Sequence, residues 1–341
     1  MRAIPLSVVK GEKNMKLFIT GGSGFIGTHL VRRLAQDDHE LRCLVRKTSD
    51  VHVLKEAGAT LITGDVTDKA SMYEGMQGCD GVANLANVYA FWVPDKRVYE
   101  EVNVHGTRNV IECALEARIP KVVHVSTSVI YGRPADCPYT EESPVGPVRF
   151  SAYAQSKYDG DLIAWELYEQ RGLPLVMVYP GAVLGPGDPK ASGRYIQNLI
   201  HRRTPGQVFT DTVLTWVHVR DVAEVIVRAL EKEGNIGEKY LVGKEQLSFQ
   251  ELNSMISEIS RVPLPAIRLP NGMVKMNAAL LTWWADLVKK PPMLGMSVDQ
   301  IRTMCEGFQF DGSKAERELD IAYTPIRTAL EETIASYRDG T

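Results

Sequence analysis

The stretch KLFITGGSGFIG at residues 16–27 decides the fold. An apolar, strand-like run leads directly into four glycines within TGGSGFIG at 20–27, and a helical pattern follows. Glycine lets the backbone turn sharply and approach a ligand without a Cβ in the way. The N–H groups that open the helix can then point at a pyrophosphate, assisted by the helix dipole. Strand, glycine loop and helix together predict a dinucleotide site; a glycine-rich turn without a ligand is the alternative.

Strand-like and helical patterns alternate from this loop onward. The strand candidates are short and mostly apolar throughout, which is typical of strands buried on both faces of a parallel sheet. We therefore predict an α/β fold with a doubly wound parallel (Rossmann) sheet. The predicted strands are 16–20, 41–46, 60–63, 81–85, 121–126 and 173–179, and the predicted helices are 26–36, 71–76, 98–117 and 153–171.

The pattern changes after Pro180. The run Gly-Pro-Gly-Asp-Pro at 185–189 indicates a loop, and helical stretches dominate beyond it. We predict an N-terminal tail at 1–14 and a dinucleotide-binding domain at 15–184, with returning segments near 212–243. Residues 185–211 and 244–341 are predicted to form a smaller, mostly helical substrate lobe.

Composition excludes several classes of protein. The chain has 341 residues, of which 44% are hydrophobic, and a net charge of −3. No apolar run is as long as the roughly 18 residues that a membrane-spanning helix needs. The near-neutral net charge gives no general electrostatic reason to bind nucleic acid. None of the five cysteines has metal-ligand spacing. We therefore expect thiols in a reducing cytoplasm and no metal site.

The end of the second predicted strand bears on which dinucleotide is bound. A ribose 2′-hydroxyl is usually held by a carboxylate about 20 residues after the loop, whereas a 2′-phosphate needs arginine. Here Arg46 ends the strand, Lys47 follows it, and the first carboxylate is Asp50. This favours NADP over NAD, with a solvated basic turn as the alternative. Asp65 and Val66, after the third strand, are expected at the adenine, or else Asp65 caps a helix.

Tyr153 and Lys157 are four residues apart and share one face of a predicted helix. A nearby ammonium and the positive nicotinamide ring favour the phenolate and are expected to lower the pKa of Tyr153. The phenol then suits proton transfer at a carbinol oxygen. Thr127, at the end of the fifth strand, is placed to donate to the same oxygen, although strand-end capping is the alternative. Without Thr127 at the end of the fifth strand, Tyr153 and Lys157 would be interpreted as an ordinary pair of surface residues.

Taken together, these motifs resemble the extended short-chain dehydrogenase/reductase family, also called the NAD-dependent epimerase/dehydratase family. The resemblance covers roughly residues 15–245 and implies Thr127, Tyr153 and Lys157 as the catalytic set, with Lys157 also holding the nicotinamide ribose. Its motifs are TGGSGFIG at 20–27, GDV at 64–66, NLAN at 84–87, NVHGT at 103–107, STSVIYG at 126–132, YAQSK at 153–157, YPGAVLGPGD at 179–188 and WVHVRDVA at 216–223. It implies cofactor contacts from Gly21, Gly24, Phe25, Ile26, Gly27, Asp65, Val66, Leu85, Ala86, Asn87, Asn103, Pro180 and Val183.

Departures from the family pattern narrow the expected chemistry. Sugar dehydratases of the family carry Asp-Glu after the catalytic threonine, but Ser128 and Val129 stand here. Nucleotide-sugar enzymes usually have an arginine where this chain has Leu214. The pattern is most similar to dihydroflavonol-reductase-like proteins and the bacterial hopanoid-associated sugar epimerase group. The leading expectation is an NADPH-dependent reductase of a ketone; a sugar or nucleotide-sugar epimerase comes second, and a non-catalytic dinucleotide sensor third.

Two features of the chain bear on whether it binds a second copy of itself, an apolar substrate or a membrane surface. The predicted helices 98–117 and 153–171 are the pair that often forms a dimer interface in this family, so a homodimer is expected by resemblance. Trp283 and Trp284 lie in the predicted C-terminal lobe. We favour packing within a core helix for them over a lid on an apolar substrate. Contact with a membrane surface is a weaker alternative still, because the basic cluster that follows, Lys289 and Lys290, has only two residues.

Overall fold

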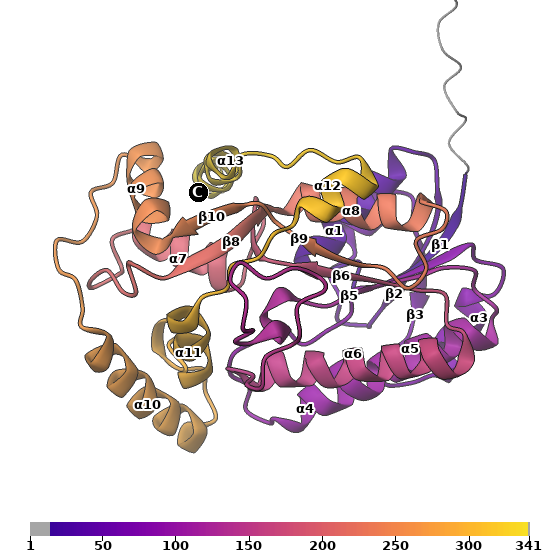
Figure 1. Cartoon of the computed structure of the whole chain (residues 1–341), viewed down its shortest axis with the longest axis horizontal. Coiled ribbons are helices and arrows are strands. Elements are labelled where there is room, and N and C mark those ends of the chain that lie inside the picture. Colours follow the sequence, from indigo (N-terminus) through magenta and orange to yellow (C-terminus); the bar gives the residue numbers. More distant parts are fainter. Residues whose placement is uncertain (1–13, 340–341) are drawn as a thin grey trace, which may run out of the picture.

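The computed structural model describes residues 14–339 and has a parallel β-sheet at its centre (Figure 1). All but one residue of the predicted tail at 1–14 lie outside the described residues. Strands follow the order β3-β2-β1-β4-β5-β6-β9, and each neighbouring pair is parallel. The order reverses beside β1, which is the doubly wound arrangement predicted. The strands are β1 (Lys16–Thr20), β2 (Glu40–Val45), β3 (Thr60–Thr63), β4 (Gly81–Asn84), β5 (Val122–Val125), β6 (Leu175–Pro180) and β9 (Lys239–Val242).

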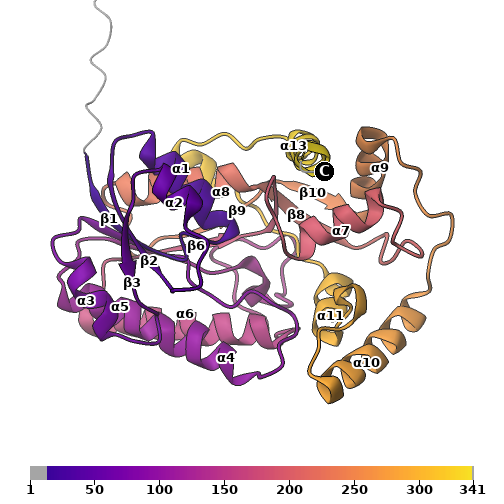
Figure 2. The same ribbon diagram turned by 180° about the vertical axis from the view of Figure 1, so that it is seen from behind.

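Helices cover both faces of this sheet (Figures 1 and 2). One buried apolar cluster joins the sheet to α1, α8 and α12, and a second joins its other face to α3, α5 and α6. Burial on both faces explains why the strands read as apolar throughout. These helices are α1 (Phe25–Ala35), α2 (His52–Glu56), α3 (Ala70–Met76), α4 (Arg97–Tyr99), α5 (Gly106–Glu116), α6 (Ala152–Arg171), α8 (Val219–Glu231) and α12 (Ser313–Leu319).

The predicted helix at 98–117 is not uniform. A π-helical segment, Glu100–His105, separates α4 from α5. Here the backbone presses against α6, since a Cβ on Gly160 would lie 2.6 Å from the Asn103 carbonyl oxygen. The Thr107 hydroxyl donates to that same carbonyl at 2.8 Å. The wide turn therefore brings Asn103 close to the helix that carries Tyr153 and Lys157.

A second sheet forms the base of the C-terminal half. In it β8 (Val213–His218) pairs in parallel with β7 (Ala182–Leu184) and antiparallel with β10 (Glu245–Ser248). Within the segment 212–243, β9 pairs with β6 of the main sheet and α8 packs on that sheet, whereas β8 belongs to this second sheet. A third apolar cluster packs around it. The remaining helices are α7 (Ala191–Ile200), α9 (Phe249–Ser260), α10 (Asn271–Val288), α11 (Val298–Glu306) and α13 (Ile326–Asp339), with 3-10 turns at Ser128–Tyr131 and Met293–Gly295.

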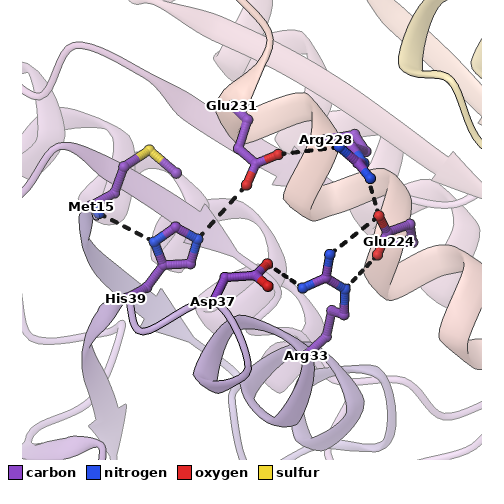
Figure 3. Close-up of polar contacts among 7 residues, drawn as sticks. All are labelled: Met15, Arg33, Asp37, His39, Glu224, Arg228 and Glu231. Atoms are coloured by element: carbon purple, nitrogen blue, oxygen red, sulfur yellow. Dashed lines mark hydrogen bonds and ion pairs between the residues drawn. The ribbon is translucent and has the colours of Figure 1, made fainter. Parts of the chain in front are cut away.

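An ion-pair cluster links α1 to α8 (Figure 3). Arg33 pairs with Asp37, just after the end of α1, and its Nε donates to Glu224 of α8 at 2.6 Å. Arg228 donates to the same carboxylate at 2.8 Å. These charges are partly exposed, so each pair contributes modestly to stability, and their role is to fix how the two helices pack.

His39 lies beside two carboxylates, in a group with the composition of a metal site (Figure 3). Asp37, His39 and Glu231 bring one candidate ligand atom each to within 4.8 Å of one another. However, His39 Nδ1 accepts a hydrogen bond from the Met15 backbone N–H at 3.1 Å. In the neutral ring the proton therefore sits on Nε2, which faces Glu231 Oε1 at 3.7 Å. A protonated Nε2 is no metal ligand, so the group fits a structural link.

Candidate active site

A cavity of about 850 Å³ opens at the carboxyl edge of the main sheet. Its walls come from the loops that follow β1 to β6 and, on the other side, from the lobe built on the second sheet. Open α/β sheets bind ligands in this crevice because the strand order reverses there. The predicted glycine loop, the basic turn, Thr127 and Tyr153 all line this one space.

The glycine loop closes as tightly as its sequence requires. Gly21 has a φ of +69°, and a Cβ there would lie 2.7 Å from the Leu85 backbone. A Cβ on Gly27 would lie 2.1 Å from the Gly21 carbonyl oxygen. Gly24 begins α1 with no side chain capping its first N–H groups. These N–H groups border the cavity, so the loop fits the pyrophosphate of a dinucleotide.

The basic turn after β2 lies at one end of the cavity. Arg46 and Ser49 line it, and their backbones are joined in a turn by a 3.0 Å hydrogen bond. Lys47 is exposed and is not among the lining residues. The Asp50 carboxylate accepts a hydrogen bond from the His52 N–H at 3.1 Å, where α2 begins. The first carboxylate after the strand is thus directed to a helix N-terminus, which leaves Arg46 as the charged side chain of this turn that lines the cavity.

The turn after β3 contributes Asp65 and Val66 to the same wall. Asp65 Oδ1 accepts hydrogen bonds from both the backbone N–H and the hydroxyl of Thr67, at 2.9 and 2.8 Å. Asp65 therefore organises its own turn while remaining at the cavity, and it does not cap the helix that follows, because the N-cap of α3 is Lys69.

The segment after β4 supplies the floor. Leu85, Ala86 and Asn87 line the cavity. Asn103 does not; it is fully buried and fastens this segment to α6 instead. Its Oδ1 accepts from the Val88 N–H at 2.7 Å, and its Nδ2 donates to the Ser156 hydroxyl at 2.9 Å. Pro180 and Val183 border the cavity from the loop after β6.

Tyr153 and Thr127 both line the cavity, and their side chains are hydrogen-bonded to each other. Tyr89 and Phe91 pack against the Tyr153 ring, with centroids 5.1 and 6.1 Å away. Burial raises the pKa of Tyr153 well above its ordinary value, and a hydrogen bond with Thr127 acts in the opposite direction. Desolvation therefore opposes the lowering that the ammonium and the nicotinamide ring are expected to bring, and it favours the neutral phenol, which is the form that can donate a proton.

Lys157 is not among the residues that line the cavity. Only 1% of it is exposed, and its Nζ donates to the Val125 carbonyl at 3.0 Å. Burial lowers the pKa of Lys157, and the charge of Asp161 opposes that shift. A buried ammonium with one carbonyl partner depends on a nearby anion, and Asp161 is that anion.

A polar network that sequence reasoning missed supports Asp161. Thr20 donates to Asn84 Oδ1 at 2.6 Å, so the Asn84 amide nitrogen, 2.9 Å from His124 Nδ1, is the donor to that ring. The ring proton then lies on Nε2, 3.5 Å from Asp161 Oδ1. Ser126 donates to the other oxygen of Asp161 at 2.6 Å. A histidine inside an apolar strand and an aspartate four residues after Lys157 were the available signals.

Beyond Tyr153 the cavity is largely apolar. Its wall there is formed by side chains from the loop after β4, the second sheet and α11, and Arg46 and Lys190 are the cations among the lining residues. Trp283 and Trp284, expected to pack in a core, instead lie exposed outside the cavity. The aromatic and long aliphatic side chains of this half are Tyr89, Phe91, Tyr195, Ile196, Leu214, Trp216, Phe249, Leu252, Met304 and Phe308.

Comparisons with known proteins agree with this geometry. The model of the NAD dependent epimerase/dehydratase family matches residues 17–243. A putative dihydroflavonol 4-reductase of Synechocystis is 32% identical over 93% of each chain, and sterol demethylase protein B of Methylococcus capsulatus is 28% identical over 95% of this chain and 99% of its own. The crystal structure of gox2253 superposes with a TM-score of 0.83 at 33% identity, covering 96% of this chain and 99% of that one.

Proposed function

The chain belongs to the NAD dependent epimerase/dehydratase family, and from this premise we propose that it is an NADPH-dependent reductase of an apolar ketone. The family assignment makes it an NAD(P)-dependent oxidoreductase of the extended short-chain type. The finer statement rests on the substrate half of the cavity, which is walled mainly by aromatic and aliphatic side chains.

The cavity wall also bears on the nucleotide-sugar alternative. A nucleotide sugar brings a diphosphate, which proteins hold with arginine forks and other donors. Arg46 is the arginine among the lining residues, and it stands at the turn after β2, away from Tyr153. Leu214, where the family's nucleotide-sugar enzymes usually have arginine, contributes an apolar surface. The relative named as a sterol demethylase protein is in keeping with an apolar substrate.

The binding half of the cavity fits NADP(H). The glycine loop residues Gly21, Gly24 and Gly27, with Phe25 and Ile26, would hold the pyrophosphate. Arg46, with Lys47 nearby, would hold the 2′-phosphate, because Asp50 is already directed to α2. We assign the adenine to Asp65 and Val66, and the nicotinamide half to Leu85, Ala86, Asn87, Pro180 and Val183. The division into a cofactor domain and a C-terminal substrate lobe is part of this proposal.

The chain's own residues would then handle the proton. When bound, NADPH supplies the hydride to the carbonyl carbon. Tyr153, whose neutral form is favoured by burial, donates its proton to the oxygen as the alkoxide forms. Thr127 donates a hydrogen bond that orients the same oxygen. Lys157, held at the Val125 carbonyl, stabilises the negative charge left on Tyr153. Asn103 has a positioning role, because it fixes the segment after β4 against α6.

The test follows NADPH absorbance in the purified protein with a panel of apolar cyclic ketones. We expect net consumption of NADPH matched by alcohol, with NADH much less effective. Tyr153→Phe should lose about 10²- to 10⁴-fold in rate while still binding NADPH. Tyr158→Phe is the matched control, since Tyr158 is on the same helix, stacks on Arg149 and does not line the cavity.

Three outcomes would overturn the proposal. Interconversion of sugar epimers without net NADPH consumption would identify an epimerase. Cofactor binding without turnover of any ketone would favour a sensor. An unchanged rate in Tyr153→Phe would refute the assigned proton donor. The proposed homodimer is tested separately, by sedimentation of the purified chain.

A further inference from the structure

Helix α10 presents a stripe of large apolar side chains to solvent. Met273, Met276, Leu280, Trp283 and Leu287 recur every three or four residues, which places them on one face. Trp283 is 65% exposed and Leu287 63%, and the neighbouring Trp284 is 56% exposed. Single exposed apolar residues are ordinary, but a continuous row of this size marks an interaction surface.

The opposite face of α10 accounts for its attachment to the protein. Val274, Ala278 and Ala285 are buried, and the Thr282 hydroxyl accepts from the Val298 N–H at 2.9 Å, where α11 begins. Both views show α10 at the edge of the molecule with α11 on its inner side (Figures 1 and 2). The protein is thus covered on one side of this helix, and the apolar stripe faces away from it.

Positive charge surrounds the stripe. Lys275 lies near its beginning, and Lys289 and Lys290 follow its end. Between Glu258 and Asp299 the sequence holds five cations and a single carboxylate, Asp286, in a chain whose overall charge is −3. Asp286 accepts a hydrogen bond from the Trp92 indole at 2.8 Å. The surface therefore combines apolar area, tryptophans and cations, which is the composition of an interfacial helix on anionic lipid.

A second copy of the chain fits this surface less well. In an antiparallel pairing of two α10 helices, Lys275 of one copy meets Lys289 and Lys290 of the other; in a parallel pairing each lysine meets its own counterpart. Like charges are brought together in either case, with Asp286 the only acidic residue of the helix. Anionic phospholipid headgroups supply the missing negative charge.

The stripe is also connected to the mouth of the cavity. Trp92, bonded to Asp286 of α10, lies between Phe91 and Val93, which both line the cavity. The Ser297 hydroxyl, at the beginning of α11, donates to the Phe91 carbonyl at 2.9 Å. Since α11 lines the cavity as well, a bilayer against α10 would lie next to the substrate entrance.

We infer that α10 docks the protein on the surface of a membrane that contains anionic phospholipid, with its tryptophans at the boundary between headgroups and acyl chains. Among residues 14–339 no helix is long and apolar enough to cross a membrane, so the contact is peripheral. The inference stands on the surface of α10 and does not depend on the proposed reaction.

The experiment is co-sedimentation of the full chain with phosphatidylcholine vesicles, with and without phosphatidylglycerol, alongside tryptophan fluorescence. We expect binding and a blue shift only with phosphatidylglycerol, weakened by added salt. The variant Trp283→Ser/Trp284→Ser should bind at least about tenfold more weakly. Lys289→Gln/Lys290→Gln should lose about fivefold for each lysine. Ile236→Ser is the matched control, because it removes an apolar side chain that is 47% exposed on another surface.

The inference fails if the parent does not bind anionic vesicles, or if the tryptophan variant binds them as tightly as the parent. It also fails if the parent is a dimer that does not bind vesicles and the tryptophan variant is a monomer, since α10 would then join two copies of the chain. Thermal unfolding and NADPH affinity should not change in these variants, because the substituted side chains face solvent.

Discussion

Replacing Asp161 with asparagine should leave Lys157 as a buried charge without its counter-charge. Asp161 is 2% exposed and Lys157 1%, so solvent cannot compensate. The hydrogen-bond partner of Nζ, the Val125 carbonyl, is uncharged, so Asp161 supplies the compensating negative charge. Leaving a buried charge uncompensated in this way costs about 3–5 kcal/mol. With about 2.1 cal/mol/K of unfolding entropy per residue, Asp161→Asn should lower Tm by about 4–7 °C at pH 7.

The pH dependence separates this charge effect from lost packing. Burial already lowers the pKa of Lys157, and without Asp161 that pKa falls further. The unfolded variant then binds a proton that the folded variant gives up as pH rises. The free energy of unfolding of Asp161→Asn should therefore rise toward that of the parent between pH 7 and 10, by at most about 1.4 kcal/mol per pH unit.

The assay is urea unfolding of both proteins across that pH range. Asp159→Asn serves as the control, because Asp159 is on the same helix and bonds only the exposed amide of Gln155 among the described contacts. It should change stability by less than about 0.5 kcal/mol. A stability gap for Asp161→Asn that stays constant with pH would refute the reasoning, since lost hydrogen bonds and not an unpaired ammonium would then explain it.

Three further predictions address the cofactor site and the network below it. Arg46→Ala should weaken NADPH binding roughly 10- to 150-fold and leave NADH binding unchanged, by fluorescence titration; equal losses would contradict its role at the 2′-phosphate. Gly27→Ala should weaken NADPH binding more than about tenfold, because its Cβ would lie 2.1 Å from the Gly21 carbonyl, whereas Gly22→Ala, with 3.4 Å to its nearest atom, should bind normally. Burial lowers the pKa of His124 below 6.5. The unfolded chain therefore binds a proton that the folded chain does not, and the free energy of unfolding falls as the pH drops below that value. His124→Gln should reduce this dependence of stability on pH by up to about 1.4 kcal/mol per pH unit, and an unchanged dependence would exclude His124 as its source.

Much of the fold could be predicted because it is encoded by patterns short enough to read locally. Predicted strand 16–20 coincides with β1, which is buried along almost its whole length because helices cover both faces of the sheet. Predicted strand 60–63 coincides with β3, which lies at the edge of the sheet and is exposed at both of its threonines. The glycine loop was recognisable for a similar reason. Its close approaches require glycine at set positions between a strand and a helix, and no distant partner is needed to see that requirement.

The contacts of individual side chains could not be predicted in this way. The four-residue spacing places Lys157 on the face of Tyr153, but only the packing of α6 against β5 brings its Nζ to the Val125 carbonyl. Asn103 likewise matches a family motif that implies a cofactor contact. In the structure, however, its side-chain amide is hydrogen-bonded to Val88 and Ser156. Such partners depend on how segments far apart in the chain are placed, which periodicity does not contain.

The sequence by itself determined the sheet, the glycine loop and the presence of Thr127 and Tyr153 at one edge of that sheet, because each follows from local spacing. Only the tertiary structure decided which face of α10 is covered. That helix carries apolar residues on several sides, so Trp283 and Trp284 could pack inward or face solvent. Packing against α11 buries the small residues Ala278 and Ala285 and leaves the tryptophans outside, since helices approach most closely through their small side chains.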